Sequence, residues 1–166
     1  MMQQQPIMGL TPESPTCEMT IEELLLHALI MEREAVQRYQ QLAEMMQVVG
    51  NAKVAKIFAK MSNIEAKHVA RIEEQIADHA LPILTPSEYR WRGTESPENA
   101  DSGRVYHLMT PREAMSLALD CEEHAFTFFD DVVDDSTDEN VRELAAKFAV
   151  EEKEHVAWVQ EWLADL

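Results

Sequence analysis

Residues 150–158 read VEEKEHVAW and lie in a segment where apolar residues recur every three or four positions. This spacing predicts an amphipathic helix whose apolar stripe faces partner helices. In that stripe Glu152 and His155 take positions that packing would normally give to an apolar side chain. Because a glutamate is rarely fully buried without a partner, the pair predicts a polar site inside a helical core.

Three other segments carry the same kind of stripe, and every stripe is apolar at both ends and ionisable only near its centre. The neighbouring acids Glu34, Glu123, Glu151 and Glu154 lie beside the stripes and are expected in solvent or at the margin. The four stripes are Leu25, Ala28, Glu32, Ala35, Tyr39, Leu42, Met46; Val54, Phe58, Met61, Glu65, His68, Ile72; Met115, Ala118, Glu122, Ala125, Phe129, Val132; and Val141, Ala145, Phe148, Glu152, His155, Val159.

Start and stop signals divide the chain into four helices of roughly 25 to 30 residues. The first follows a capping box at 20–23 and runs to Gly50, and the second runs from Asn51 to about His79. The third begins with TPRE at 110–113, and the fourth begins near Thr137 or Asp138. Residues 1–19, with three Pro and no periodicity, are predicted to form a flexible tail before one domain at 20–166.

The connections predict how these helices are arranged. Tight turns near residues 50 and 136 make the first and second helices antiparallel, and likewise the third and fourth. The segment at about 80–110 is long enough to return to the opposite end of the bundle, so that the second and third helices run parallel. The prediction is therefore an all-α, antiparallel four-helix bundle with a long crossover between helices 2 and 3.

The central carboxylates of such a bundle would meet at one depth. Four of them without partners would repel one another and lose hydration, at a cost of several kcal/mol per ion. Two divalent cations, facing four carboxylates and two neutral imidazoles, would make the cluster nearly neutral. A protonated polar network and a metal-free relic are the alternatives. The predicted ligands are Glu32, Glu65, His68, Glu122, Glu152 and His155.

Composition excludes several other classes of function. A formal net charge of −17 disfavours nucleic acid and anionic membrane surfaces as partners. Cys17 and Cys121 form no C-x-x-C pair, so a thiolate metal site is not indicated. No apolar window approaches the roughly 20 residues that span a bilayer, and no secretory signal is evident at the start. A cytoplasmic protein is expected.

The stripes also repeat within the chain, because EREAVQRY at 32–39 aligns with EEHAFTFF at 122–129, and IEAKHVA at 64–70 with EEKEHVA at 151–157. With these E-x-x-A-x-x-x-Y/F and E-x-x-H motifs, residues 20–165 resemble the ferritin-like superfamily, specifically the rubrerythrin-type di-iron proteins without the rubredoxin domain. The resemblance implies two iron ions per chain, with manganese or zinc as substitutes. It implies binding by the six predicted ligands, with Glu65 and Glu152 as bridges.

The resemblance also implies a function. The chain is expected to be a di-iron oxidoreductase of the peroxidase or ferroxidase type, oxidising Fe(II) with hydrogen peroxide or dioxygen in oxidative stress or iron handling. It is expected to use an external electron donor, since rubredoxin-type cysteines are absent, and to form a homodimer or higher homo-oligomer. Ala125 stands where rubrerythrins carry a further carboxylate, so the site resembles that of bacterioferritin more closely, which disfavours a dedicated peroxidase.

Three alternatives remain open from the sequence. Tyr39 could relay electrons, or it could be a core tyrosine whose hydroxyl is hydrogen-bonded. The chain could be the ferroxidase of an iron-storage assembly. It could also be a helical interaction module in which the metal is purely structural.

Overall fold

The computed structural model describes residues 18–91, 96–97 and 109–166. Within them the secondary structure consists of four long helices and one short 3-10 helix, η1 (Pro86–Glu88). None of these helices is both long and apolar enough to cross a membrane. The predicted tail lies almost entirely outside the described residues. The long helices are α1 (Ile21–Val48), α2 (Ala52–Ile76), α3 (Pro111–Asp135) and α4 (Glu139–Ala164).

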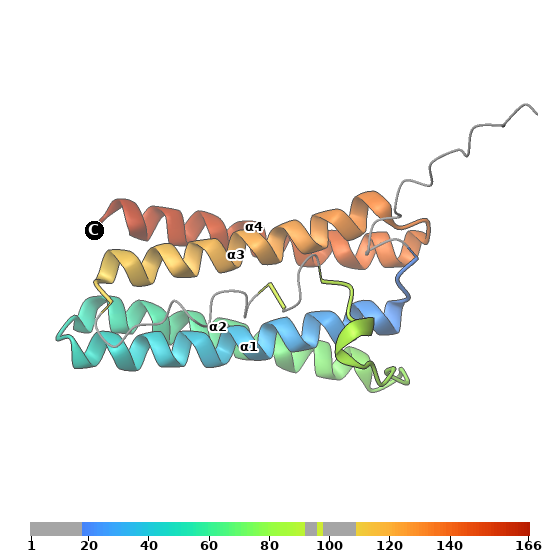
Figure 1. The fold of residues 1–166 in the computed structure, drawn as a ribbon, viewed down its shortest axis with the longest axis horizontal. Helices are drawn as coiled ribbons and strands as arrows, with labels where there is room; N and C mark the ends of the chain where they lie inside the picture. Colours follow the sequence, from blue (N-terminus) through green and yellow to red (C-terminus); the bar gives the residue numbers. More distant parts are fainter. Residues whose placement is uncertain (1–17, 92–95, 98–108) are drawn as a thin grey trace, which may run out of the picture.

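The helices form two antiparallel pairs, α1 with α2 and α3 with α4 (Figure 1). Helix α3 begins at the opposite end of the bundle from the end at which α2 finishes, so α2 and α3 run in the same direction (Figure 1). The predicted all-α bundle with a long crossover between the second and third helices is confirmed. Part of that crossover lies outside the described residues.

Helix starts are determined by side-chain caps that the sequence predicts. Thr20 and Thr110 each form a capping box with the glutamate three residues later, and Pro111 takes the first helical position of α3. Asn51 accepts a hydrogen bond of 3.0 Å from the backbone N–H of Val54 at the start of α2. Asp138 accepts from the N–H of Asn140 at 2.8 Å, which makes Asp138 the cap of α4. These bonds satisfy backbone donors that a helix leaves free at its first turn.

Helix ends follow the prediction less closely. Helix α1 ends with Val49 as C-cap, and Gly50 takes the left-handed φ of +79° that is favoured directly after a helix. Helix α2 ends at Ile76 and not at His79. The reason is that Ala77 and His79 donate to carbonyls three residues earlier, at 3.4 and 2.8 Å, so the last turn tightens.

The apolar core is divided into two clusters, which take up opposite halves of the stripes. One contains Leu25, Phe129 and Phe148, and the other contains Tyr39 and Phe58. The ionisable positions of all four stripes fall between them in the sequence of each helix. Burial of a large apolar side chain contributes about 1.5 to 3 kcal/mol, so these clusters hold the polar layer in place.

A buried histidine that the sequence analysis missed attaches the crossover to the bundle. His27 is 0% exposed, with its Nδ1 2.6 Å from the carbonyl oxygen of Glu23. Its Nε2 accepts a 2.9 Å hydrogen bond from the backbone N–H of Arg90, and its ring lies 4.4 Å from that of Trp91 and 5.7 Å from that of Phe128. Burial lowers the pKa of His27, which keeps the ring neutral and able to accept from Arg90.

This attachment predicts that His27→Ala destabilises the bundle by about 2 to 4 kcal/mol, because the change leaves a cavity and an unpaired backbone donor. Urea unfolding would measure the loss. The exposed His124→Ala is the matched control and should shift stability by less than about 0.5 kcal/mol. Equal, small effects of both changes would show that His27 does not hold the crossover.

Candidate metal centre

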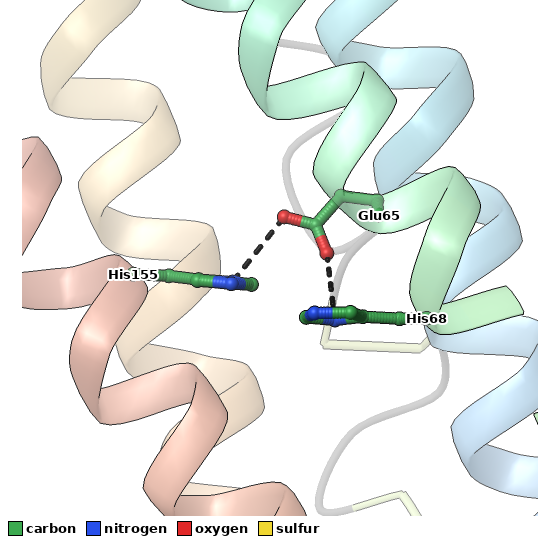
Figure 2. Close-up of side chains that lie close together, drawn as sticks. All are labelled: Glu65, His68 and His155. Carbon is green, nitrogen blue, oxygen red and sulfur yellow. Dashed lines mark ion pairs between the residues drawn. The ribbon is translucent and has the colours of Figure 1, made fainter. Parts of the chain in front are cut away.

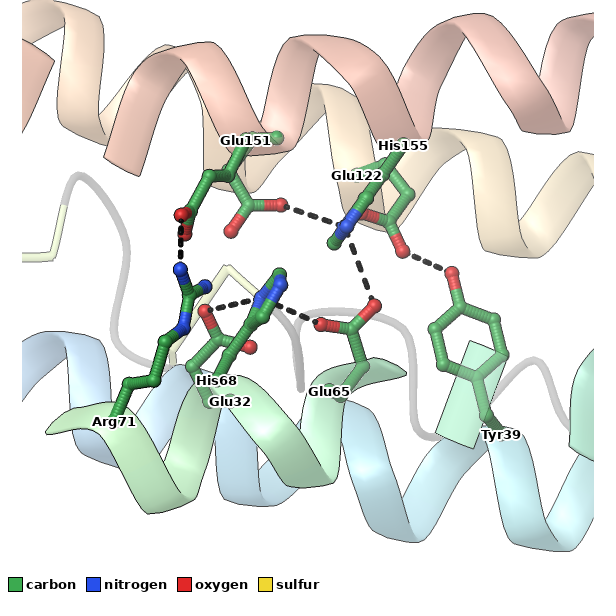
Figure 3. Close-up of polar contacts among 9 residues, drawn as sticks. Glu32, Tyr39, Glu65, His68, Arg71, Glu122, Glu151 and His155 are labelled. Atoms are coloured by element: carbon green, nitrogen blue, oxygen red, sulfur yellow. Dashed lines mark hydrogen bonds and ion pairs between the residues drawn. The ribbon is translucent and has the colours of Figure 1, made fainter. Parts of the chain in front are cut away.

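All six predicted ligands converge, each from the helix that the stripes predict. Figure 3 shows Glu32, Glu65, His68, Glu122 and His155 meeting in the middle of the bundle. The four glutamates and His155 are at most 5% exposed. The side chain of His68 is 11% exposed, which makes it the most accessible of the six. Helix α1 supplies Glu32, α2 supplies Glu65 and His68, α3 supplies Glu122, and α4 supplies Glu152 and His155.

Each imidazole lies beside the carboxylate of its own helix and that of a neighbouring helix. On α2, His68 Nδ1 is 3.3 Å from Glu65 and 3.4 Å from Glu32. On α4, His155 Nδ1 is 3.6 Å from Glu152 and 3.2 Å from Glu122. The spacing of i and i+3 accounts for the pairs within a helix, because those positions share one face.

Glu65 connects the two halves of this arrangement (Figure 2). Its Oε2 is 3.3 Å from His68 and its Oε1 is 3.2 Å from His155. The two imidazole rings stack, with centroids 5.1 Å apart and planes at 11°. A carboxylate between two imidazoles is well placed to bridge two ions. The bridging role of Glu152 stays a prediction.

Burial, followed by the negative charges of Glu122 and Glu32, raises the pKa of Glu65 well above its usual range. Burial also raises the pKa of Glu152, with the charges of Glu32 and Glu122 acting in the same direction. These two carboxyl groups therefore retain protons to higher pH than ordinary glutamates. The cluster has a shortage of positive charge at its centre.

Glu122 and His155 behave differently, because they are hydrogen-bonded to each other. Burial would raise the pKa of Glu122, but hydrogen bonds from His155 and Tyr39 outweigh burial and lower it. Burial would lower the pKa of His155, but its bonds to Glu122 and Glu152 and their charges raise it to about 10. An imidazolium here supplies part of the charge that the carboxylates require.

The donor set fits divalent metal ions. Glu65 Oε1 and His68 Nδ1 are buried and take part in no hydrogen bond, although ionisable groups surround them. Among the described residues, two sets of three donors have ligand atoms within 4.8 Å of one another: Glu65, His68 and His155, and Glu122, Glu152 and His155. Carboxylate and imidazole donors suit iron, manganese and zinc. The six side chains therefore converge as metal ligands do, and two of their polar atoms remain without a hydrogen bond.

Tyr39 lies beside the centre and donates a hydrogen bond to Glu122 Oε1 (Figure 3). Tyr39 is fully buried, as expected of a core tyrosine with a bonded hydroxyl. The bond orients a carboxylate whose other oxygen faces His155, in the manner of groups that support metal ligands. The relay of electrons by Tyr39 stays a prediction. Ala125 is buried and presents only a methyl group.

The residues beside the stripes lie as predicted, but one of them has a partner that sequence reasoning missed. Glu123 and Glu154 are exposed, whereas Glu151 is partly buried and pairs with Arg71 at 2.8 Å. The ring of Trp158 stacks on that of His155 at 5.3 Å, a contact that sequence reasoning also missed. The internal repeat places Arg71 and Trp158 at equivalent positions, each three residues after a histidine of the centre, but it does not indicate what either side chain contacts.

The charge distribution predicts opposite effects of two neutral substitutions in protein treated with a chelator. Glu65→Gln should stabilise the metal-free bundle by about 1 to 3 kcal/mol, because a neutral amide avoids the cost that burial and the neighbouring charges impose on this carboxyl group. Glu122→Gln should destabilise it by a similar amount, because Tyr39 and His155 lose a charged acceptor. Urea unfolding at pH 7 measures both, and shifts of the same sign would contradict this distribution of charge.

The raised pKa values also predict how the stability of the metal-free protein depends on pH. The pKa of Glu65 is 4.5 in the unfolded chain and higher in the folded protein. The contribution of Glu65 to stability is therefore fully present below pH 4.5 and is lost as the pH rises through the folded pKa. His155 acts in the same direction between 6.5 and about 10. Metal-free wild type should therefore lose stability from pH 5 to pH 9, and Glu65→Gln should lose less.

Comparisons with known proteins agree with this architecture. No curated protein matches the chain. A solved structure of an uncharacterised conserved protein from Magnetospirillum magnetotacticum MS-1 is similar, with 33% sequence identity and a TM-score of 0.74. The similarity covers 89% of this chain and 95% of that protein. The family model described as Rubrerythrin matches residues 23–163, which cover nearly the whole of the four helices and include all six converging side chains. The chain belongs to the rubrerythrin family.

Proposed function

We propose that the chain is a di-iron oxidoreductase that couples oxidation of Fe(II) to reduction of hydrogen peroxide or dioxygen. The observation that carries the proposal is the convergence of four carboxylates and two imidazoles in a core otherwise built of apolar side chains. Membership of the rubrerythrin family supports iron as the metal. In this proposal Glu32, Glu65 and His68 would hold one ion and Glu122, Glu152 and His155 would hold the other, with Glu65 and Glu152 shared between them as the family resemblance implies.

Two ferrous ions bound there would supply one electron each, which with two protons reduces one hydrogen peroxide to two waters. The protein provides the surroundings for this chemistry. The two apolar clusters limit water around the centre, so charges interact strongly there. Tyr39 holds Glu122 in one orientation, and its hydroxyl carries a proton next to a carboxylate of the centre.

Metal binding must compete with the protons that Glu65, Glu152 and His155 retain. Because these groups have raised pKa values, metal must displace protons from them, so uptake should release protons and strengthen with rising pH. The electrons that restore the ferrous state come, in this proposal, from an external donor. The cytoplasmic location and the homo-oligomeric state stay predictions.

Anaerobic loading with Fe(II), followed by exposure to air, tests the function. Metal analysis should give two ions per chain, and rapid oxidation should follow exposure. His68→Ala and His155→Ala should each abolish rapid oxidation, whereas the exposed Glu154→Ala should change it less than about twofold. One ion or fewer per chain would contradict a dinuclear centre. Two ions that do not react would indicate the structural-metal alternative.

Ala125 predicts the preference between oxidants. With a methyl group one turn after Glu122, position 125 offers no further carboxylate to exchange beside the six proposed ligands. Stopped-flow oxidation by hydrogen peroxide and by dioxygen should therefore give rates within about tenfold of each other, a barrier difference of about 1.4 kcal/mol. A rate with peroxide that is orders of magnitude higher would assign the chain as a dedicated peroxidase.

A further inference from the structure

A cavity of about 110 Å³ lies between α2 and α4, directly beside the centre. His68 forms part of its lining, so a predicted metal ligand is in contact with it. Ile72 and Phe148 supply apolar walls, and Arg71, Lys147 and Glu151 supply charges. About 10 to 15 Å³ of such volume suffices for one water, so the cavity admits molecules of a few heavy atoms.

The two halves of the centre differ in what covers them, although the repeat makes their ligands equivalent. His155 is 2% exposed, and the Trp158 ring three residues later stacks on it at 5.3 Å. The side chain of His68 is 11% exposed, and Arg71 occupies the place that corresponds to Trp158. Figure 3 shows Arg71 reaching from α2 to Glu151 on α4, beside His68.

The Arg71–Glu151 pair beside His68 and the Trp158 ring on His155 also differ in how readily they move aside. The Arg71 and Glu151 side chains are 54% and 28% exposed, and an exposed ion pair contributes about 1 kcal/mol at most. It therefore breaks and reforms readily, on the timescale of side-chain motion. Displacing Trp158 would expose the stacked face of an indole and of a buried imidazole, which costs more.

We propose that the cavity beside His68 is the entrance through which small uncharged or anionic reactants reach the centre, with the Arg71–Glu151 ion pair as its movable cover. The proposal rests on the proposed di-iron function. Two cationic side chains, Arg71 and Lys147, face one carboxylate in the lining, and Lys147 forms no ion pair with a described residue. In a chain of net charge −17 this local excess of positive charge favours an anion over a divalent cation.

Azide binding to the iron-loaded, oxidised protein tests the entrance, because its charge-transfer band with ferric ion reports association directly. Arg71→Trp places a large ring over the cavity, as Trp158 lies over His155, and should slow azide association at least tenfold. Arg33→Trp is the matched control, since Arg33 is 56% exposed, pairs with Glu73 and does not line the cavity. Its rate should stay within about twofold of wild type.

A second pair of variants tests the charge of the entrance without filling it. Lys147→Glu should slow azide association several-fold at low salt, and the effect should shrink as salt is added. Lys153→Glu makes the same change of net charge at an exposed position on α4 outside the lining and should have a smaller effect.

Metal analysis separates failure of the entrance from failure of the function. Wild type that binds no iron contradicts the di-iron function itself. Iron-loaded Arg71→Trp and Arg33→Trp proteins with equal azide rates contradict the entrance alone. Faster association in Trp158→Ala, with no change in Arg71→Trp, would place the entrance on the His155 side and overturn the proposal.

Discussion

The repulsion among four buried carboxylates is the constraint on which the rest of the structure depends. Glu32, Glu65, Glu122 and Glu152 lie in a core otherwise made of apolar side chains, where charge is poorly screened. The protein compensates with hydrogen-bond donors and positive charge. Tyr39 and His155 donate to Glu122, whereas Glu65 and Glu152 retain protons to unusually high pH. A positive charge brought into such a centre would be stabilised by the carboxylates around it.

The bundle brings these carboxylates together because each lies near the middle of its helix. Midpoints of helices of similar length coincide whether neighbours run parallel or antiparallel, so the crossover does not disturb the alignment. The phase of each helix matters more, since one residue corresponds to about 100° of rotation. The caps Thr20, Asn51, Thr110 and Asp138 determine where the helices begin, and they thereby help to keep the acids turned inward.

The sequence predicted the four helices and all six converging side chains because both follow from local rules. Caps and 3-4 spacing act within a few residues, and they indicate which face of a helix is buried. They cannot indicate what covers the remaining faces. His27 lies off the predicted stripe of α1 and is buried because residues 89–91 of the crossover, 63 positions away at Arg90, fold over it. The Arg71–Glu151 pair was missed for the same reason, since it joins α2 to α4.

The internal repeat shows how equivalent ligands acquire unequal surroundings. Both halves supply a Glu-x-x-His from one helix and a single glutamate from another, and local spacing alone would make them identical. They differ one turn after each histidine, where Arg71 lines a cavity with charged walls beside His68 and Trp158 stacks on His155. Because ligand exchange depends on access as well as on donor type, the two metal positions should differ in how fast they exchange small ligands. The asymmetry of such a centre is then determined by residues that bind no metal at all.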